Sequence, residues 1–477
     1  MKKLPSVLLV FALLLGGSTV ASAAACPCHE PAAQHIRSEF DRLNVPNAAV
    51  AVIQGGETSY ILHGDTQQDT LFQIGSIAKS MTGFGVLLLE DMGLLSVYDS
   101  VNEHLPWFTV NYNGQAVPHA DIAIYNLLHH TSGITDVTLR IGVEEVTKAE
   151  LIEQLDGIEL AFYPSTEFTY GNVNYVLLGL IIEAASGQTY EDFMTQAVFH
   201  PLGMYDTFMN AQLAHATGRV AGGHRVGFLG ASPHEVSLAA ILAPAGGGGA
   251  YSSIADMARW AGIHFGTIAV SPQFARVVQR SHMHHHATDA PFEGHETPHG
   301  AMTYGAGWIM FDSGRLGHSG GTISYSADMM IFPDRDMAVV FLSNLRFVNP
   351  APWTMMIADA MEGEFNQVPR DLYSAIDIGM MVVIAVVVVA VFGQLAFGLS
   401  RHFGGSEQSP SLVGPGISLA LSGLGLLTFY AGLPALFGVP FGDLMLQAPA
   451  STTPALVSIW VMFAFSLSSL LARVFIF

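Results

Sequence analysis

Ser76 and Lys79 stand three residues apart at the start of a segment, 76–92, whose composition is typical of a buried helix. Residues at this spacing share one face of a helix. A serine hydroxyl is a weak nucleophile until a neighbouring group takes its proton. An adjacent ammonium and the positive end of a helix both favour the alkoxide. The pair predicts a nucleophilic serine with a lysine partner; the alternative is a helix-capping serine beside a solvated lysine.

A second motif, Tyr170-Gly171-Asn172, precedes a predicted helix at 174–185. A free phenol has a pKa of about 10, but a neighbouring cation lowers that pKa until the phenolate accepts a proton. Lys79 is the expected cation. The Asn172 amide can hydrogen-bond to a lysine and to a substrate amide. The motif therefore predicts a tyrosine base, and its alternative is a turn with a core ring.

The third motif is His318-Ser319-Gly320-Gly321, placed before a strand expected to begin near Ile323. Two glycines let a substrate lie along a strand edge and leave a backbone N–H free to meet an oxyanion. A glycine-rich hairpin without a catalytic role is the alternative.

Strand patterns lie near both ends of the middle part of the chain. The runs 48–53 and 59–62 predict a hairpin, because Gly55 and Gly56 tolerate the positive φ of a tight turn. A second hairpin is predicted at 326–332 and 337–343. Helices are predicted at 76–92, 148–154, 174–185 and 253–265. This order favours an α+β domain whose sheet is closed by the two ends of the domain, with a helical part beside it.

Taken together and in this order, the three motifs resemble those of the serine beta-lactamase-related hydrolases. This branch contains class C beta-lactamases, low-molecular-weight penicillin-binding proteins and related esterases. The resemblance covers about residues 35–345 and includes the phrases at 127–133, 199–204, 244–247 and 304–308. It implies an antiparallel sheet flanked by helices, a helical subdomain, and a site in the cleft between them.

The resemblance also implies a role for each motif residue in an acyl-enzyme mechanism that needs no metal or organic cofactor. Ser76 would be acylated, with Lys79 as its proton partner and Tyr170 as the general base. The N–H groups of Ser76 and Gly321 would form the oxyanion hole. The remaining substrate-binding residues would be Asn172, His318, Ser319 and Gly320.

The third motif departs from the Lys-Thr-Gly usual in beta-lactamases, because His318 replaces the lysine. A histidine with an ordinary pKa of about 6.5 is mostly neutral at pH 7. A permanent cation for a substrate carboxylate is therefore missing at this position. The substitution shifts the expected small-molecule or peptide substrate from beta-lactams toward esters and peptides.

Composition places the two ends of the chain at a membrane. Residues 1–25 are typical of a signal peptide, 26–373 form the working domain, and 374–477 contain three apolar runs at 378–399, 414–437 and 455–472. Arginines flank the sides expected to be cytoplasmic. The sequence predicts a domain outside a bacterial cytoplasmic membrane, held there by lipid contact of the C-terminal helices. Cys26 is either a lipid attachment site or part of a free or metal-binding pair with Cys28.

The charge balance excludes a role in nucleic-acid binding: 18 basic and 39 acidic residues give a formal net charge of -21. The histidines between His282 and His299 are expected to form a solvated loop rather than a metal site. His129 and His130 are expected to pack the helical part rather than act as acid or base. A non-catalytic sensor of cell-wall fragments, signalling through the predicted spans, is the rival function, and the extra spans suggest a membrane-protein partner.

Overall fold

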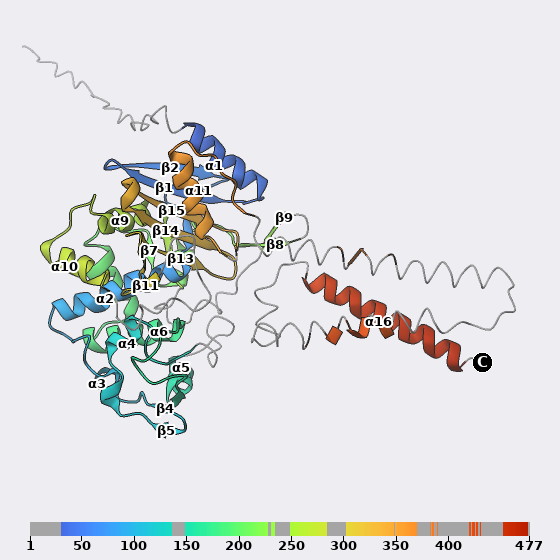
Figure 1. The fold of residues 1–477 in the computed structure, drawn as a ribbon, viewed down its shortest axis with the longest axis horizontal. Helices are drawn as coiled ribbons and strands as arrows, with labels where there is room; N and C mark the ends of the chain where they lie inside the picture. The colour runs from blue at the N-terminus through green and yellow to red at the C-terminus, as the bar shows by residue number, and fades with distance from the viewer. Residues whose placement is uncertain are drawn as a thin grey trace, which may run out of the picture.

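An antiparallel sheet of seven strands is the frame of the domain (Figure 1). The computed structural model describes residues 30–135, 148–227, 230–233, 249–283, 302–347 and 349–369, a helix at 452–475, and scattered positions between 382 and 430. Across the sheet the strands run β11 (Met302–Tyr304), β12 (Ile309–Phe311), β13 (Leu316–Gly321), β14 (Ser326–Phe332), β15 (Met337–Ser343), β1 (Ala48–Gln54) and β2 (Glu57–His63).

The two ends of the domain meet in this sheet. Strand β1 pairs with β15 from Ala48 opposite Ser343 to Gln54 opposite Met337. Both predicted hairpins are confirmed as β1–β2 and β14–β15. The α+β fold class and the closure of the sheet by distant segments are therefore confirmed.

Strand β1 is apolar from Ala48 to Ile53, and both of its faces are covered. Ala49, Ala51 and Ile53 belong to the core cluster that includes α9 (Ile254–Phe265). The alternate residues Val50 and Val52 belong to a second cluster with α1 (Glu30–Arg42) and α11 (Ala351–Met361). Successive side chains of a strand point to opposite faces, so a continuous apolar run fits a sheet between two helical layers.

A central helix, α2 (Ala78–Asp91), connects the sheet to the helical part and is buried from Ala78 to Leu89. It packs against α6 (Asn172–Ser186) and α10 (Pro272–Ser281). The predicted helices are confirmed, with ends that shift by one to two residues in most cases. The remaining helices are α3 (Val101–His104), α4 (Ile124–Leu128), α5 (Lys148–Leu155), α7 (Tyr190–Phe193) and α8 (Ala211–Ala216). Further short strands are β4 (Val110–Tyr112), β5 (Gln115–Ala116), β6 (Ile158–Glu159), β8 (His224–Gly227) and β9 (Gly230–Pro233).

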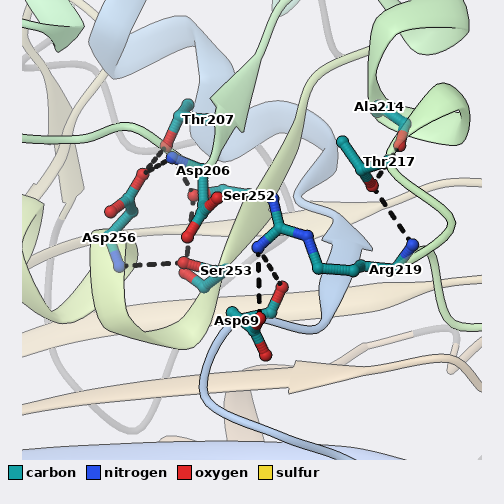
Figure 2. Close-up of polar contacts among 9 residues, drawn as sticks. All are labelled: Asp69, Asp206, Thr207, Ala214, Thr217, Arg219, Ser252, Ser253 and Asp256. Carbon is teal, nitrogen blue, oxygen red and sulfur yellow. Dashed lines mark hydrogen bonds and ion pairs between the residues drawn. The ribbon is translucent and has the colours of Figure 1, made fainter.

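A small sheet of β3 (Leu71–Gln73), β10 (Tyr251–Ser253) and β7 (Thr207–Phe208) leads the chain into the segment that carries Ser76. Figure 2 shows the polar network beside it: Arg219 contacts Asp206 at 2.6 Å and Asp69 at 3.3 Å. The carboxylate of Asp256 accepts hydrogen bonds from the Asp206 N–H at 2.7 Å and the Thr207 hydroxyl at 2.8 Å. Burial raises the pKa of Asp256 to about 6. These contacts fix the approach of β3 to the motif.

The predicted membrane and export segments lie mostly beyond the residues described. The signal peptide falls there, and only scattered positions of the first two predicted spans are described, whereas helix α16 (Thr452–Phe475) overlaps the third predicted span. Where the structure describes side chains, no helix offers a stretch long and apolar enough to cross a membrane. The three spans therefore stay a prediction.

Candidate active site

Ser76 lies in a single 3₁₀ turn, η1 (Gly75–Ile77), between β3 and the first residue of α2. The predicted helix start at 76 is thus corrected to Ala78. Gly75 has a φ of +52°, a left-handed conformation that favours glycine. The Ile74 N–H donates to the Ala250 carbonyl at 3.0 Å, which anchors the turn to β10. The serine is half-buried and keeps part of its surface open.

Lys79 is fully buried in the first turn of α2. Its Nζ donates to the Ser76 Oγ at 2.9 Å and to the Asn172 Oδ1 at 2.7 Å. Asn172 is the first residue of α6, two residues earlier than the predicted start of that helix. The first and second motifs therefore meet through one ammonium group.

Tyr170 stands beside this ammonium, with the Lys79 Nζ 4.9 Å from the centre of its ring. A cation over an aromatic face is attracted by the ring quadrupole. The ring is half-buried and lies at the end of the segment that enters α6. The structure thus brings together Ser76, Lys79, Tyr170 and Asn172.

The third motif is the end of strand β13 itself, which corrects the expectation that it precedes a strand beginning near Ile323. The next strand, β14, begins at Ser326 and pairs with Gly321. Strand alternation places the Ser319 side chain on the face opposite His318 and Gly320. Glycines are needed at 320 and 321 for close packing rather than for a turn.

The glycine pair touches the turn that carries Ser76. A Cβ atom on Gly75 would lie 2.5 Å from the backbone nitrogen of Gly321. A Cβ atom on Gly320 would overlap the carbonyl oxygen of Ile74. Glycine within a strand often marks such a close backbone approach. Gly321 is exposed, and its backbone nitrogen lies beside the serine turn.

His318 is buried and neutral. Its Nδ1 donates to the Ser319 carbonyl at 2.7 Å, and its Nε2 therefore accepts from the Tyr304 hydroxyl at 3.0 Å. Burial and the Lys79 ammonium lower the pKa of His318 to about 3. This agrees with the expectation of a mostly neutral histidine, although the cause is burial rather than an ordinary pKa.

Ser319, predicted to bind substrate, donates its hydroxyl hydrogen bond to Asp328 at 2.5 Å. The Thr354 hydroxyl on α11 also donates to this carboxylate. Burial raises the pKa of Asp328 to about 6. Asp328 was not found by motif reasoning, because its only sequence signal is a single acid in an apolar strand pattern.

His130 is a further residue that sequence reasoning underrated. Its buried ring centre lies 4.5 Å from that of Tyr170, and its Nδ1 accepts from the Asn174 side chain at 3.0 Å and from the Gly171 N–H at 3.3 Å. Burial and Lys79 hold the pKa of His130 well below its usual value. His130 does pack the helical part, as expected, but it does so against the predicted base.

Of the predicted histidine-rich loop, only His282 lies within the described residues. Its Nε2 is 2.9 Å from the His264 Nδ1, and burial lowers the pKa of His282 to about 4. Among all the residues that the structure describes, no group of three or more His, Cys, Asp or Glu side chains could hold a metal ion.

Comparison with known proteins places this geometry in a family. A sequence profile of the beta-lactamase family matches residues 32–358. The chain belongs to this family, whose members are generally serine hydrolases. The fold is of the beta-lactamase and penicillin-binding-protein type.

Two curated relatives and one solved structure illustrate the likeness. Protein flp of Staphylococcus aureus (strain NCTC 8325 / PS 47) is 28% identical over 324 residues, which is 65% of this chain and 62% of that protein. Penicillin-binding protein 4* of Bacillus subtilis (strain 168) is 27% identical over 347 residues, 65% of this chain and 71% of that protein. The octameric penicillin-binding protein homologue from Pyrococcus abyssi has the same fold, with a TM-score of 0.58 at 23% identity over 70% of this chain and 77% of that one.

Proposed function

We propose that this protein is a serine hydrolase that cleaves an ester or amide through an acyl-enzyme. One observation carries the proposal: a single buried ammonium, Lys79, hydrogen-bonds the hydroxyl of Ser76 and also the side chain of Asn172. A buried lysine is costly unless its donors are satisfied. Its place between a half-open serine and the second motif suits a proton-transfer partner better than a solvated surface residue.

The reaction follows from these positions. The Ser76 Oγ forms a bond to the substrate carbonyl carbon while its proton passes to the phenolate oxygen of Tyr170, a form that the neighbouring Lys79 ammonium favours. The carbonyl oxygen gains negative charge next to the N–H groups of Ser76 and Gly321. The bond to the leaving group then breaks, and the leaving group takes the proton. Water attacks the resulting ester at Ser76, releases the acid product and restores the serine.

The neutral state of His318 affects which classes of substrate are expected. Beta-lactam-hydrolysing relatives of this motif usually carry a lysine where His318 stands, and a buried imidazole held neutral cannot replace that cation. We therefore place short esters and peptide amides ahead of beta-lactams as substrates. A hydrolysis panel with short-chain esters, D-amino-acid amides, D-Ala-D-Ala peptides and a chromogenic cephalosporin ranks these classes.

The hydrolase domain is expected to lie outside the cytoplasmic membrane. The composition of residues 1–25 and 374–477 supports an exported domain tethered to a bacterial cytoplasmic membrane, with the hydrolase outside. Protease treatment of intact spheroplasts, followed by detection of the domain, tests this. Protection of the domain from protease would contradict the location.

A fluorophosphonate probe tests the chemistry directly. The full chain, purified in mild detergent, should be labelled at Ser76, and Ser76→Ala should be neither labelled nor active. Ser80→Ala is the matched control, because Ser80 is a fully buried serine on the same helix. Labelling elsewhere would contradict the proposal, and an acylation burst without turnover would favour the sensor over the hydrolase.

A further inference from the structure

Asp328 is a fully buried carboxyl group that no step of the proposed reaction uses. It lies in β14 opposite Ser319 of β13, and its Oδ1 accepts the hydrogen bond from the hydroxyl of that serine at 2.5 Å. Its Oδ2 accepts a hydrogen bond from the hydroxyl of Thr354, on α11. One carboxyl group therefore links strand β13 to a helix in the layer that lies across the sheet from α2.

The charge of this group costs the fold stability. Burial raises the pKa of Asp328 to about 6, so the carboxylate predominates at neutral pH. It faces Ser319 on β13, Phe341 opposite it on β15, and Thr354 on α11. Within the described ranges of the chain Asp328 forms no ion pair. A buried charge without a counter-ion is unfavourable, which indicates a role other than stability.

The ionised group differs from a neutral amide in how it orders the two hydroxyl groups beside it. A carboxylate accepts at both oxygens, so the hydroxyls of Ser319 and Thr354 both donate to it. An amide accepts at one atom and donates at the other, so one of the two hydroxyls would have to turn its proton elsewhere. Hydrogen bonds to an ionised acceptor are also stronger than those between neutral groups. The carboxylate therefore holds Ser319 more firmly than an asparagine side chain would.

Ser319 stands directly before the two glycines that touch the nucleophile turn. A Cβ atom on Gly320 would overlap the carbonyl oxygen of Ile74, and one on Gly75 would lie 2.5 Å from the backbone nitrogen of Gly321. A small shift of β13 would therefore change the contact between the strand and the turn. An oxyanion donor works only at the correct place, and a displacement of about 1 Å can cost about 100-fold in rate.

We propose that Asp328 is a positioning residue for the hydrolysis: through Ser319 it fixes the end of β13, and with it the N–H of Gly321, where the oxyanion forms on the substrate. The inference rests on the proposed hydrolase function and adds to it a residue that does not touch the substrate. The ionised carboxylate is the effective form, and the protonated group holds the strand less firmly.

The test measures how fast a fluorophosphonate probe labels Ser76 in the full chain in mild detergent, and it separates the maximal labelling rate from the apparent affinity for the probe. In Asp328→Asn at pH 7.5 the maximal rate should fall about tenfold, while the affinity stays within about twofold and the free energy of unfolding does not decrease. A merely structural role would lower stability and leave the maximal rate unchanged. The ratio of wild-type to variant rates should be near 1 below pH 5 and should rise as the pH passes about 6.

Two further sets of variants test the path from the carboxylate to the strand. Thr354→Val removes the second donor and should lower the maximal labelling rate several-fold, whereas Thr354→Ser keeps a hydroxyl and should retain the wild-type rate. Ser319→Ala combined with Asp328→Asn should be no slower than Ser319→Ala alone, because Asp328 acts through Ser319.

Glu39→Gln is the matched control. Glu39 is a buried carboxylate on α1, in the same helical layer as α11, and it accepts hydrogen bonds at 2.9 Å from Arg42 and from the Val368 N–H. This variant should leave the labelling of Ser76 unchanged. A wild-type rate in Asp328→Asn, a flat rate ratio across the pH range, or additive losses in the double variant would each overturn the inference while the hydrolase function stands. No labelling of Ser76 in wild type would overturn the proposed function and the inference with it.

Discussion

The Nζ of Lys79 lies 2.7 Å from the Oδ1 of Asn172, a residue 93 positions further along the chain. This contact joins the start of α2 to the start of α6 and aims the lysine at Ser76. Two helices that pack side by side thus determine where the Lys79 ammonium lies relative to the Ser76 hydroxyl.

Asn172→Ala removes an acceptor from a buried ammonium and should lower the rate of Ser76 acylation by about 10- to 100-fold. It should also reduce the free energy of unfolding by about 1–3 kcal/mol, because the lost partner leaves Lys79 under-satisfied. Fluorophosphonate labelling rates and denaturant unfolding measure the two effects. Asn172→Asp keeps an acceptor oxygen and should retain more stability than Asn172→Ala; equal losses in the two variants would argue against the role of this hydrogen bond.

Gly320→Ala should be destabilising, because its Cβ atom would overlap the Ile74 carbonyl that precedes the nucleophile turn. Overpacking of this kind typically costs about 1–3 kcal/mol, and here the strain falls on the serine turn, so activity should decline as well. Gly222→Ala is the control, since nothing lies within 4 Å of the Cβ position at Gly222. Thermal unfolding and ester hydrolysis distinguish the two, and a silent Gly320→Ala would contradict the close approach.

Acid should destabilise the fold through His318. Burial lowers the pKa of this histidine to about 3. Below about pH 6.5 the imidazole of His318 is therefore protonated in the unfolded chain but stays neutral in the folded chain. Its contribution to stability is present above pH 6.5 and is lost as the pH falls toward about 3. Unfolding free energies of wild type and His318→Gln, measured across this range, should converge at low pH. His119→Gln, at an exposed position, should show the wild-type slope.

Asp328 should act in the opposite direction. Burial raises its pKa to about 6, so the folded chain holds the proton more tightly than the unfolded chain, whose pKa is about 3.9. The stabilisation is full below that value and is lost as the pH rises through about 6. Between pH 4 and pH 7 wild type should therefore lose stability relative to Asp328→Asn. Asp65→Asn, at an exposed position, serves as the comparison, and parallel curves for wild type and Asp328→Asn would refute the assignment.

Local sequence patterns were sufficient to predict the main helices and strands. The hairpin β14–β15 begins and ends at the predicted residues, because apolar runs bounded by Pro333 and Asp336 leave one register that buries them. The three motifs were found from residue type and spacing, and the neutral state of His318 was anticipated. The glycine pair was expected to precede a strand and to receive a substrate along its edge; it lies instead at the end of β13, against the turn that carries Ser76.

The partners of those motifs were decided by packing. Lys79 meets Asn172 because α2 and α6 are neighbours, and His130 reaches Tyr170 from a separate turn of chain. The Ser319 hydroxyl donates a hydrogen bond to Asp328 because the register of β13 and β14 places the two residues opposite each other. Arg346 stands against Gly321 for a similar reason, since the segment after β15 returns past the end of β13. Short-range spacing fixes which groups share a helix face or a strand, whereas contacts between distant segments depend on how whole helices and strands exclude water from their common core.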